Sequence, residues 1–285
     1  MDTGDSPASV TERFLGSSRV LVLNSQRQKI GREWQFDFCS PFWRLYVNDR
    51  SGAFLHYRGR RIPLAPGTPW IIPAWMRFQT SLLRPVTQDY LHFQVSGPLS
   101  RSLERHLKEP VNPGNDDVLQ ALIKRWRGGL DRTDFPDFCW ANATAHAALA
   151  AAFAGWTIGE QQAELSALGE HAQIQPALDF LAMQTQTPPG NRKLAGLCGM
   201  SEDHFIRKFR RATGSTPAGY GREQRISLAA EWLTGTTRTL DDIAEASGFT
   251  DRFHFSRVFK AQLGFPPAAY RRIHRLEDNP RIPTV

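Results

Sequence analysis

The sequence of 285 residues holds few cysteines and no long hydrophobic run. Its three cysteines, Cys39, Cys139 and Cys198, lie far apart and form no Cys-x-x-Cys pair. This odd, scattered set argues against a disulfide framework and against a zinc cluster. No stretch of about 18 apolar residues occurs, which excludes a membrane-spanning helix. Residues 1–14 lack the basic start and apolar stretch of a signal peptide, so we expect a cytoplasmic protein with no membrane partner.

Two motifs that would indicate enzymatic chemistry are also absent. The sequence has no glycine-rich phosphate-binding loop and no Gly-x-Ser-x-Gly nucleophile motif. We therefore predict no catalytic residue, no cofactor and no enzymatic activity.

The sequence does contain enough apolar material for packed cores, and it has an excess of positive charge. Hydrophobic residues make up 41% and aromatic residues 11%, and 35 Lys and Arg stand against 28 Asp and Glu. The length suits about two domains of roughly 100–200 residues each. We place the domain boundary between residues 165 and 166.

The positive charge gathers in two short segments of the second domain. Residues 204–225 carry six cations against one acid, and residues 251–275 again carry six against one. Two similar basic segments about fifty residues apart indicate a duplicated contact with a polyanion. On charge alone, two solvated helix faces would explain the same pattern.

An internal repeat supports the duplicated contact. Gly199 matches Gly248 at an offset of 49 residues, and the offset is 50 from Phe205 and Phe255 onward. A repeat of this period indicates a duplicated supersecondary unit. The matched residues are Phe205, Arg207, Phe209, Gly214, Pro217 and Tyr220 in one copy, and Phe255, Arg257, Phe259, Gly264, Pro267 and Tyr270 in the other.

Each copy has the pattern of a helix, a tight turn and a second helix, which together make a helix-turn-helix motif. We place the two motifs at residues 191–213 and 239–264. Gly199 and Gly248 stand where the first helix must end in a left-handed residue.

Capping residues mark the starts of these helices. In the first motif, Asn191 is the expected N-cap of the first helix and Ser201 that of the second. In the second motif, Thr239 and Asp242 have the spacing of a capping box, and Thr250 is the expected N-cap of the following helix.

The second helix of each motif has an apolar face and a basic face. At about 100° per residue, the matched phenylalanines share one side and the matched arginines lie on the other. Arginine in a major groove can bind O6 and N7 of guanine, so Arg207 and Arg257 are the expected base readers. Phe253 is either a base contact or a side chain that packs at the start of its helix. Further candidates for DNA contact on these faces are Arg210, His254 and Lys260.

A linker helix is predicted between the two copies. Residues 217–234 have helical spacing of apolar side chains, with Pro217 at the first helical position. Eighteen helical residues span about 27 Å, which approaches the roughly 34 Å of one DNA turn. A rigid helix of this length would place two readers in successive major grooves without a dimer.

Residues 173–276 resemble the DNA-binding domain of the AraC/XylS family of bacterial transcription regulators. The segments that carry the resemblance are residues 225–233, 239–244, 248–249, 255–260 and 264–270. The resemblance implies an all-α domain with two helix-turn-helix units joined by a linker helix. Double-stranded DNA is the expected partner, and RNA polymerase is a further candidate for an activator of this family.

The base-contacting positions of the family fall on Asp203, Ile206 and Arg207, and on Arg252, Phe253, Ser256 and Arg257. Asp203 departs from the family pattern, because a carboxylate repels phosphate and can only accept a hydrogen bond from a cytosine amine. The first motif is therefore expected to read few bases.

The first 165 residues contain short β-rich runs separated by turn signals, which indicate an antiparallel barrel or sandwich. The runs are residues 42–47, 53–57, 62–67, 70–72 and 90–95, and helical patterns follow at 99–107, 118–126 and 140–153. Segments 64–73 and 91–97 look like the cupin-type sensor domain of the same family. The predicted fold class is α+β: a cupin-like barrel with flanking helices, followed by an all-α DNA-binding domain.

In relatives, such a barrel binds a small effector, often a sugar. Aromatic faces with a polar handle suit a sugar, and the expected effector-binding residues are Trp34, Trp43, Trp70, Trp75 and His92. For each of them, packing in a core or interface is the alternative. Metal-binding cupins carry paired histidines as His-x-His, and this motif is absent, so we predict no metal site.

Three functions remain open at this point. The first is a transcription regulator that responds to a small-molecule effector. The second is an effector-independent dimeric DNA-binding or architectural regulator, and the third is a cupin enzyme fused to a DNA-binding domain. A homodimer is expected from the family, and candidate contacts are the apolar helix residues Leu119, Leu122, Ile123 and Trp126, for which packing onto the barrel is the alternative.

Overall fold

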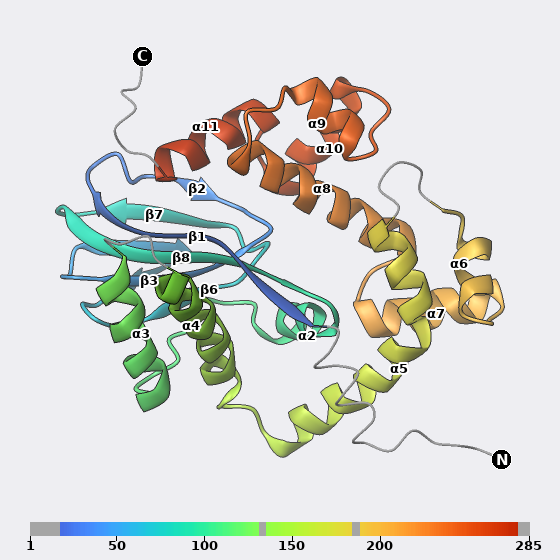
Figure 1. The fold of residues 1–285 in the computed structure, drawn as a ribbon, viewed down its shortest axis with the longest axis horizontal. Coiled ribbons are helices and arrows are strands. Elements are labelled where there is room, and N and C mark those ends of the chain that lie inside the picture. Colours follow the sequence, from blue (N-terminus) through green and yellow to red (C-terminus); the bar gives the residue numbers. More distant parts are fainter. Residues whose placement is uncertain (1–17, 131–134, 184–188, 279–285) are drawn as a thin grey trace. The chain divides into compact units, whose positions relative to one another are not determined.

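A computed structural model describes residues 18–130, 135–183 and 189–278 (Figure 1). They fall into two compact units. Residues 19–96 and 103–156 form a β-rich unit, and residues from 157 onward, together with 97–102, form a helical unit. The polar N-terminal segment, residues 1–14, lies outside the described residues. The predicted boundary after residue 165 falls within α5 (Ile158–Met183) and stays a prediction.

The β-rich unit consists of two four-stranded antiparallel sheets, with strand orders β1-β8-β3-β6 and β2-β7-β4-β5. This arrangement confirms the predicted α+β class. The strands are β1 (Arg19–Ile30), β2 (Asp37–Phe38), β3 (Trp43–Asn48), β4 (Ala53–Tyr57), β5 (Arg60–Pro63), β6 (Trp70–Ile72), β7 (Phe78–Leu82) and β8 (Val86–Ser96).

Strand β3 is buried on both faces, and its alternating side chains define an inner and an outer face of its sheet. The guanidinium of Arg44 lies over the rings of Phe38 and Phe78, 4.8 and 5.4 Å from their centroids. These rings belong to β2 and β7, so the face that carries Arg44 is the inner face, turned toward the second sheet. Trp43 is its neighbour in sequence and therefore lies on the outer face.

Two helices, α3 (Asp117–Gly129) and α4 (Phe135–Phe153), pack together and cover the outer face (Figure 1). Trp126 of α3 donates its indole hydrogen to Ser25 of β1 at 2.7 Å. Leu119, Ile123 and Trp126 are all buried. Packing against α4, together with the bond of Trp126 to β1, accounts for these three buried side chains, and the fourth candidate, Leu122, is half-buried. In the sequence, α2 (Pro98–His106) follows β8 and precedes α3.

The helical unit contains seven helices among the described residues. They are α5 (Ile158–Met183), α6 (Asn191–Leu197), α7 (Glu202–Thr213), α8 (Pro217–Gly235), α9 (Leu240–Ala246), α10 (Arg252–Leu263) and α11 (Pro267–Asp278). None of the described helices of the chain combines the length and hydropathy that a membrane crossing requires.

The helix starts confirm two of the expected caps and correct two others. Thr239 and Asp242 form the predicted capping box, and Ser201 is the N-cap of α7. Asn191 is instead the first residue of α6, and Gly190 stands at its N-cap position. Thr250 is not the cap of α10, because the carboxylate of Asp251 accepts the hydrogen bond from His254 N at 2.7 Å. In both cases the N-cap is the neighbour of the expected residue. Gly and Asp are also common at N-cap positions, so the sequence alone does not decide between the two neighbours.

Candidate nucleic-acid interface

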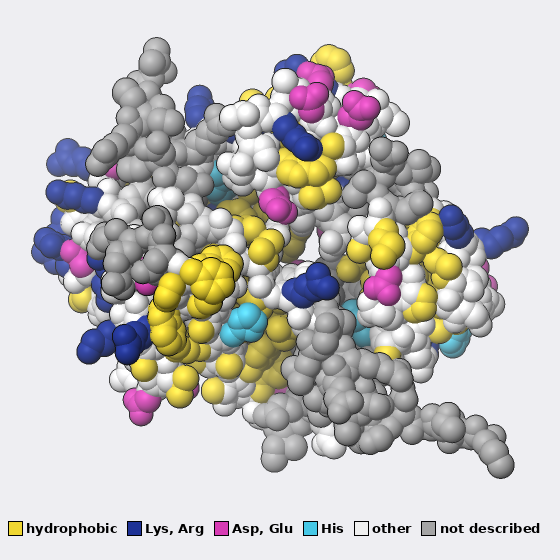
Figure 2. All heavy atoms as spheres, in the orientation of Figure 1, with side chains coloured by type: hydrophobic (Ala, Val, Ile, Leu, Met, Phe, Trp, Pro, Cys, Tyr) yellow, Lys and Arg dark blue, Asp and Glu magenta, His cyan; other side chains and the backbone are white. Residues whose placement is uncertain are grey.

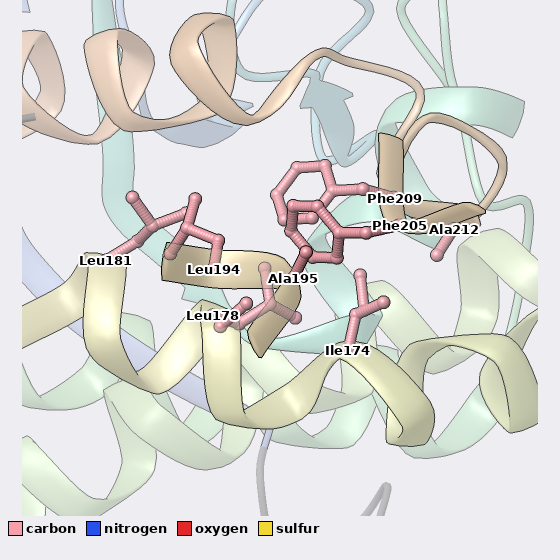
Figure 3. Close-up of a cluster of buried hydrophobic side chains, with 9 residues drawn as sticks. Ile174, Leu178, Leu181, Leu194, Ala195, Phe205, Phe209 and Ala212 are labelled. Atoms are coloured by element: carbon pink, nitrogen blue, oxygen red, sulfur yellow. The ribbon is translucent and has the colours of Figure 1, made fainter. Parts of the chain in front are cut away.

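The first motif holds α7 against α5 and α6 through one buried cluster (Figure 3). Figure 3 shows Phe205 and Phe209 of α7 pointing toward the side chains that rise from α5 and α6. The cluster consists of Ile174, Ala177, Leu178, Leu181, Leu194, Ala195, Phe205, Phe209 and Ala212. Because this apolar face is buried, the opposite face of α7 turns to solvent.

The second motif repeats the same geometry. The ring centroids of Phe255 and Phe259 are 5.4 Å apart, which equals the separation of Phe205 and Phe209. Phe259 then meets Tyr270 edge-on at 5.2 Å. The corresponding first-copy pair, Phe209 and Tyr220, meets edge-on at 5.6 Å. The repeat in the sequence is therefore a repeat of one packing unit.

Left-handed glycines end the helices of both motifs. Gly199 and Gly248 have φ angles of +63° and +73° and close the turns between the paired helices. Gly214 and Gly264, at +72° and +85°, end α7 and α10. These turns set the angle at which α7 and α10 leave the motif.

The predicted DNA-contact residues all lie at least partly in solvent. Six of them are exposed: Asp203, Arg207, Arg210, Arg252, Arg257 and Lys260. Ile206, His254 and Ser256 are half-buried. Phe253 is 85% exposed, so it does not pack against its own domain. A base contact for Phe253 stays a prediction.

The start of α10 is fixed by its own hydrogen bonds. The backbone hydrogen bond from His254 holds the pKa of the Asp251 carboxyl below its usual range. The His254 ring meets Phe249 edge-on at 5.6 Å, and Arg252 lies 3.5 Å from the Asp241 carboxylate. The cap and this ring contact limit the freedom of the residues that would enter a groove.

Several cations of the basic segments are engaged within the fold. Arg211 bonds to Glu170 of α5 at 2.8 Å, and Lys208 donates to Gln173 of the same helix. Arg225 is half-buried, donates to Gly248 O at 2.9 Å and lies over the ring of Phe249. Burial lowers the pKa of Arg225. On the exposed face of α7 this leaves Arg207 and Arg210 as the arginines that remain for DNA.

Arg225 and Arg271 join elements of the helical unit, a role that the sequence pattern does not predict. Arg225 joins α8 to the turn of the second motif, and Arg271 of α11 donates to Leu233 O and Arg238 O at the end of α8. In the sequence, each of them adds only to the charge of a basic segment. The repeat gives no signal for Arg271, because Gly221 follows Tyr220 where Arg271 follows Tyr270.

The structure gathers some of the predicted effector residues and separates others. His92 and Arg44 are directly paired across β8 and β3, so both lie on the inner face. Trp70 is paired with Tyr46 and shares that face. Trp34 meets Tyr46 edge-on at 6.3 Å, and its indole nitrogen is buried with no hydrogen-bond partner.

Trp43 and Trp75 are placed differently. Trp43 is paired with Phe93 on the outer face, so it does not share a space with His92. Trp75 lies in the turn before β7 with a φ of +62°, a left-handed conformation that is rare for an aromatic residue. A hydrogen bond from its backbone nitrogen to Ser40 O, at 2.7 Å, holds the turn against the segment before β3.

The described residues contain no group of three His, Cys, Asp or Glu side chains placed to hold a metal ion.

Comparisons with known proteins agree with this geometry. A family model described as "Helix-turn-helix domain" matches residues 194–273. The regulatory protein SoxS of Escherichia coli is 35% identical over 103 residues, which are 36% of this chain and 94% of SoxS. The MmsAB operon regulatory protein of Pseudomonas aeruginosa is 31% identical over 80 residues, which are 28% of this chain and only 26% of that protein.

A solved structure extends the likeness to both units. ToxT of Vibrio cholerae aligns with 90% of this chain and 98% of its own, at 14% identity and a TM-score of 0.53. A second ToxT structure, bound to (E)-4-(8-methylnaphthalen-1-yl)but-3-enoic acid, gives a TM-score of 0.55 over 90% of this chain and 99% of its own, also at 14% identity. At this identity the likeness concerns the fold.

Two exposed helices with arginines, a duplicated packing unit and a match over nearly all of SoxS point to one conclusion. The chain belongs to the AraC/XylS family of transcription regulators.

Proposed function

We propose that the protein is a sequence-specific, double-stranded-DNA-binding transcription regulator that responds to a small-molecule effector. The observation that carries this proposal is the repeated geometry of α7 and α10, each with buried phenylalanines and exposed arginines. A single exposed basic helix would serve for general phosphate binding. Two copies joined by α8 fit two successive major grooves.

The test is a salt-titrated binding assay of the full-length protein. DNA from upstream of its own and neighbouring genes is compared with shuffled DNA of the same length. Tight binding to one segment, with protection on one face over about two turns, is expected for a sequence-specific regulator. Equal and steeply salt-dependent binding to every DNA would favour the architectural alternative.

Two ligand classes suit the inner face of the β-rich unit. A sugar would use the indoles of Trp34 and Trp70 with His92 as a polar handle. An aromatic or apolar carboxylate, the chemistry of the acid that ToxT binds, would suit Arg44, whose guanidinium is 4.5 Å from the Phe42 ring centroid. We propose that one of these classes is the effector, bound among these residues.

The effector is tested by its action on DNA binding. Sugars and aromatic carboxylates are screened for a shift in the melting temperature of the full-length protein, and hits are then added to the DNA assay. A changed DNA affinity is expected for the effector. A hit that is chemically converted, or a stoichiometric metal in the purified protein, would instead support the enzyme alternative.

We also infer a homodimer, formed through the outer surface of α3 and α4. Figure 2 shows hydrophobic side chains gathered on the surface over α4. Val118, Phe135, Phe138 and Trp140 are exposed by 67%, 78%, 55% and 36%. We call these four residues the apolar patch. It replaces the residues expected from the sequence, because Leu119, Ile123 and Trp126 are buried and Leu122 is half-buried. A second copy could cover the patch.

The dimer is tested by mutation of the apolar patch. Phe138→Asp should lower the mass measured by sedimentation equilibrium from dimer to monomer, because a charge would be buried in the contact. Leu83→Asp, at a 73% exposed position in the turn after β7, is the matched control. A monomeric native protein would show that the patch has another use.

A further inference from the structure

Phe253 is the most exposed large hydrophobic side chain in the part of the chain that the structure describes, with 85% of its surface accessible. It lies in the first turn of α10. A single exposed apolar side chain on a protein surface needs no explanation by itself. The surroundings of Phe253 therefore decide which partner its ring fits.

The ring shares the outward face of α10 with two cations. At about 100° per residue, Phe253 lies within about 60° of Ser256, Arg257 and Lys260, whereas the buried Phe255 lies about 160° away. Arg257 and Lys260 are both exposed. An apolar ring beside positive charge fits a polyanion that also carries apolar groups. The major groove of DNA is such a surface, because phosphates line its edges and the methyl groups of thymines stand on its floor.

The fold holds the first turn of α10 and turns the neighbours of Phe253 away from it. Asp251 accepts a hydrogen bond from His254 N at 2.7 Å, which fixes the start of the helix. Arg252 and His254 lie about 100° to either side of Phe253 on the helix. Arg252 is 3.5 Å from a carboxylate of α9, and the His254 ring meets Phe249 edge-on at 5.6 Å. The ring of Phe253 therefore stands uncovered between two side chains that face other elements.

The spacing of Phe253 and Arg257 suits two nearby base pairs. The two residues are four apart on one helix, so their Cβ atoms are about 6 Å from one another. Successive base pairs are about 3.4 Å apart, so this distance covers about two steps. The N-terminal part of a recognition helix contacts base edges. Among the groups on those edges in the major groove, the 5-methyl group of thymine is the apolar one.

We propose that Phe253 reads the 5-methyl group of a thymine, within about two base pairs of the guanine that Arg257 is expected to bind. This inference rests on the proposed function. The residue of the first motif that matches Phe253 in the repeat is Asp203, whose carboxylate makes no apolar contact with a methyl group. The thymine requirement therefore belongs to the half of the DNA site that α10 contacts, and the two halves differ in sequence.

The test replaces each thymine of the preferred DNA segment by deoxyuridine, one position at a time. Deoxyuridine pairs as thymine does and lacks only the 5-methyl group. Fluorescence anisotropy at constant salt measures the affinity of the full-length protein for each DNA. At one position the native protein should bind the uracil form about fourfold more weakly, the factor that corresponds to the loss of one buried methyl-sized group. Phe253→Ala should bind the thymine and uracil forms of that position equally.

Leu83→Ala is the matched control, because it shortens an apolar side chain that is 73% exposed in the β-rich unit. It should show the same affinities as the native protein. Phe253→Ala should keep the native melting temperature, since its ring is exposed. Native affinity of Phe253→Ala for the thymine form, or a loss with uracil that is the same in Phe253→Ala at every position, would overturn the inference and leave the proposed function standing. A native protein that prefers no DNA segment would overturn both.

Discussion

At the scale of single residues, α10 presents two cations that differ in what they can read. Arg257 is a planar donor that can bind two acceptors of one guanine, whereas Lys260 is a point charge near the last turn of the helix. Both are exposed. Loss of Arg257 should therefore affect binding to one sequence, whereas loss of Lys260 should affect binding to every sequence.

Arg257→Ala should weaken binding to the cognate site by about 1–3 kcal/mol and leave binding to random DNA nearly unchanged. Lys260→Ala should weaken binding to all sequences and reduce the slope of log K against log salt by about one. Fluorescence anisotropy at several salt concentrations measures both effects. An equal loss on random DNA for Arg257→Ala would mean that Arg257 contacts phosphate.

A second residue-scale prediction concerns acid stability at the cap of α10. Because the pKa of Asp251 is lowered in the folded state, its charge stabilises the fold above the unfolded pKa. This stabilisation is lost as the pH falls through the folded pKa. Asn also caps helices but does not titrate. As the pH falls from about 5 to about 2, the melting temperature of the native protein should therefore fall relative to that of Asp251→Asn. A pH-independent difference would contradict the assigned cap.

The caps and the tryptophans show where residue-level prediction from sequence ends. Asn191 and Thr250 were reasonable caps, yet the adjacent Gly190 and Asp251 take the role, since local composition does not decide between neighbours. Trp43 was grouped with His92 by residue type. Only the pairing of β3 with β8 reveals that the two lie on opposite faces, because the register is a nonlocal property.

At the scale of elements, the first helix of the first motif and the turn after it each contain a glycine, and substitutions at the two are expected to have opposite effects. Gly196→Ala, inside α6, should stabilise the protein by about 0.5–1 kcal/mol, because alanine loses less entropy in a helix. Gly199→Ala should destabilise it by about 1–2 kcal/mol, because φ there is +63°. Neither new Cβ would meet an atom within 4 Å, so sterics do not obscure the comparison. Urea denaturation of the two variants measures both changes in the free energy of unfolding. If both variants were stabilised, or both destabilised, the result would contradict the turn geometry.

Elements were predicted from sequence with more success than single contacts. The two motifs and the linker helix follow from glycines, prolines and aromatic spacing within about fifty residues, so local signals suffice. The helical pattern over 118–126 also gave α3. The sequence does not show what covers the apolar side of α3, because an amphipathic helix can pack against its own domain or against a second subunit.

At the scale of the whole molecule, function depends on how α8 relates the two motifs. The helix has 19 residues and is therefore about 28 Å long. Ile226, Ala229, Ala230 and Leu233 are buried along it. Arg225 and Arg271 join it to the second motif and to α11. We therefore expect the two readers to be joined rigidly and to require a fixed spacing on DNA.

This rigidity can be tested by changing the DNA. Five base pairs inserted between the two contacted grooves would turn the second groove to the opposite side, since about 10.5 base pairs make a turn. Affinity should then fall to that of one motif alone. Ten inserted base pairs would restore the face but separate the grooves by a further ~34 Å, which a rigid helix of about 28 Å cannot span. No recovery is therefore expected, and the same insertions outside the protected segment should have no effect. Recovery at ten base pairs would mean that the two readers belong to different subunits, and the apolar patch on α3 and α4 would then set the spacing.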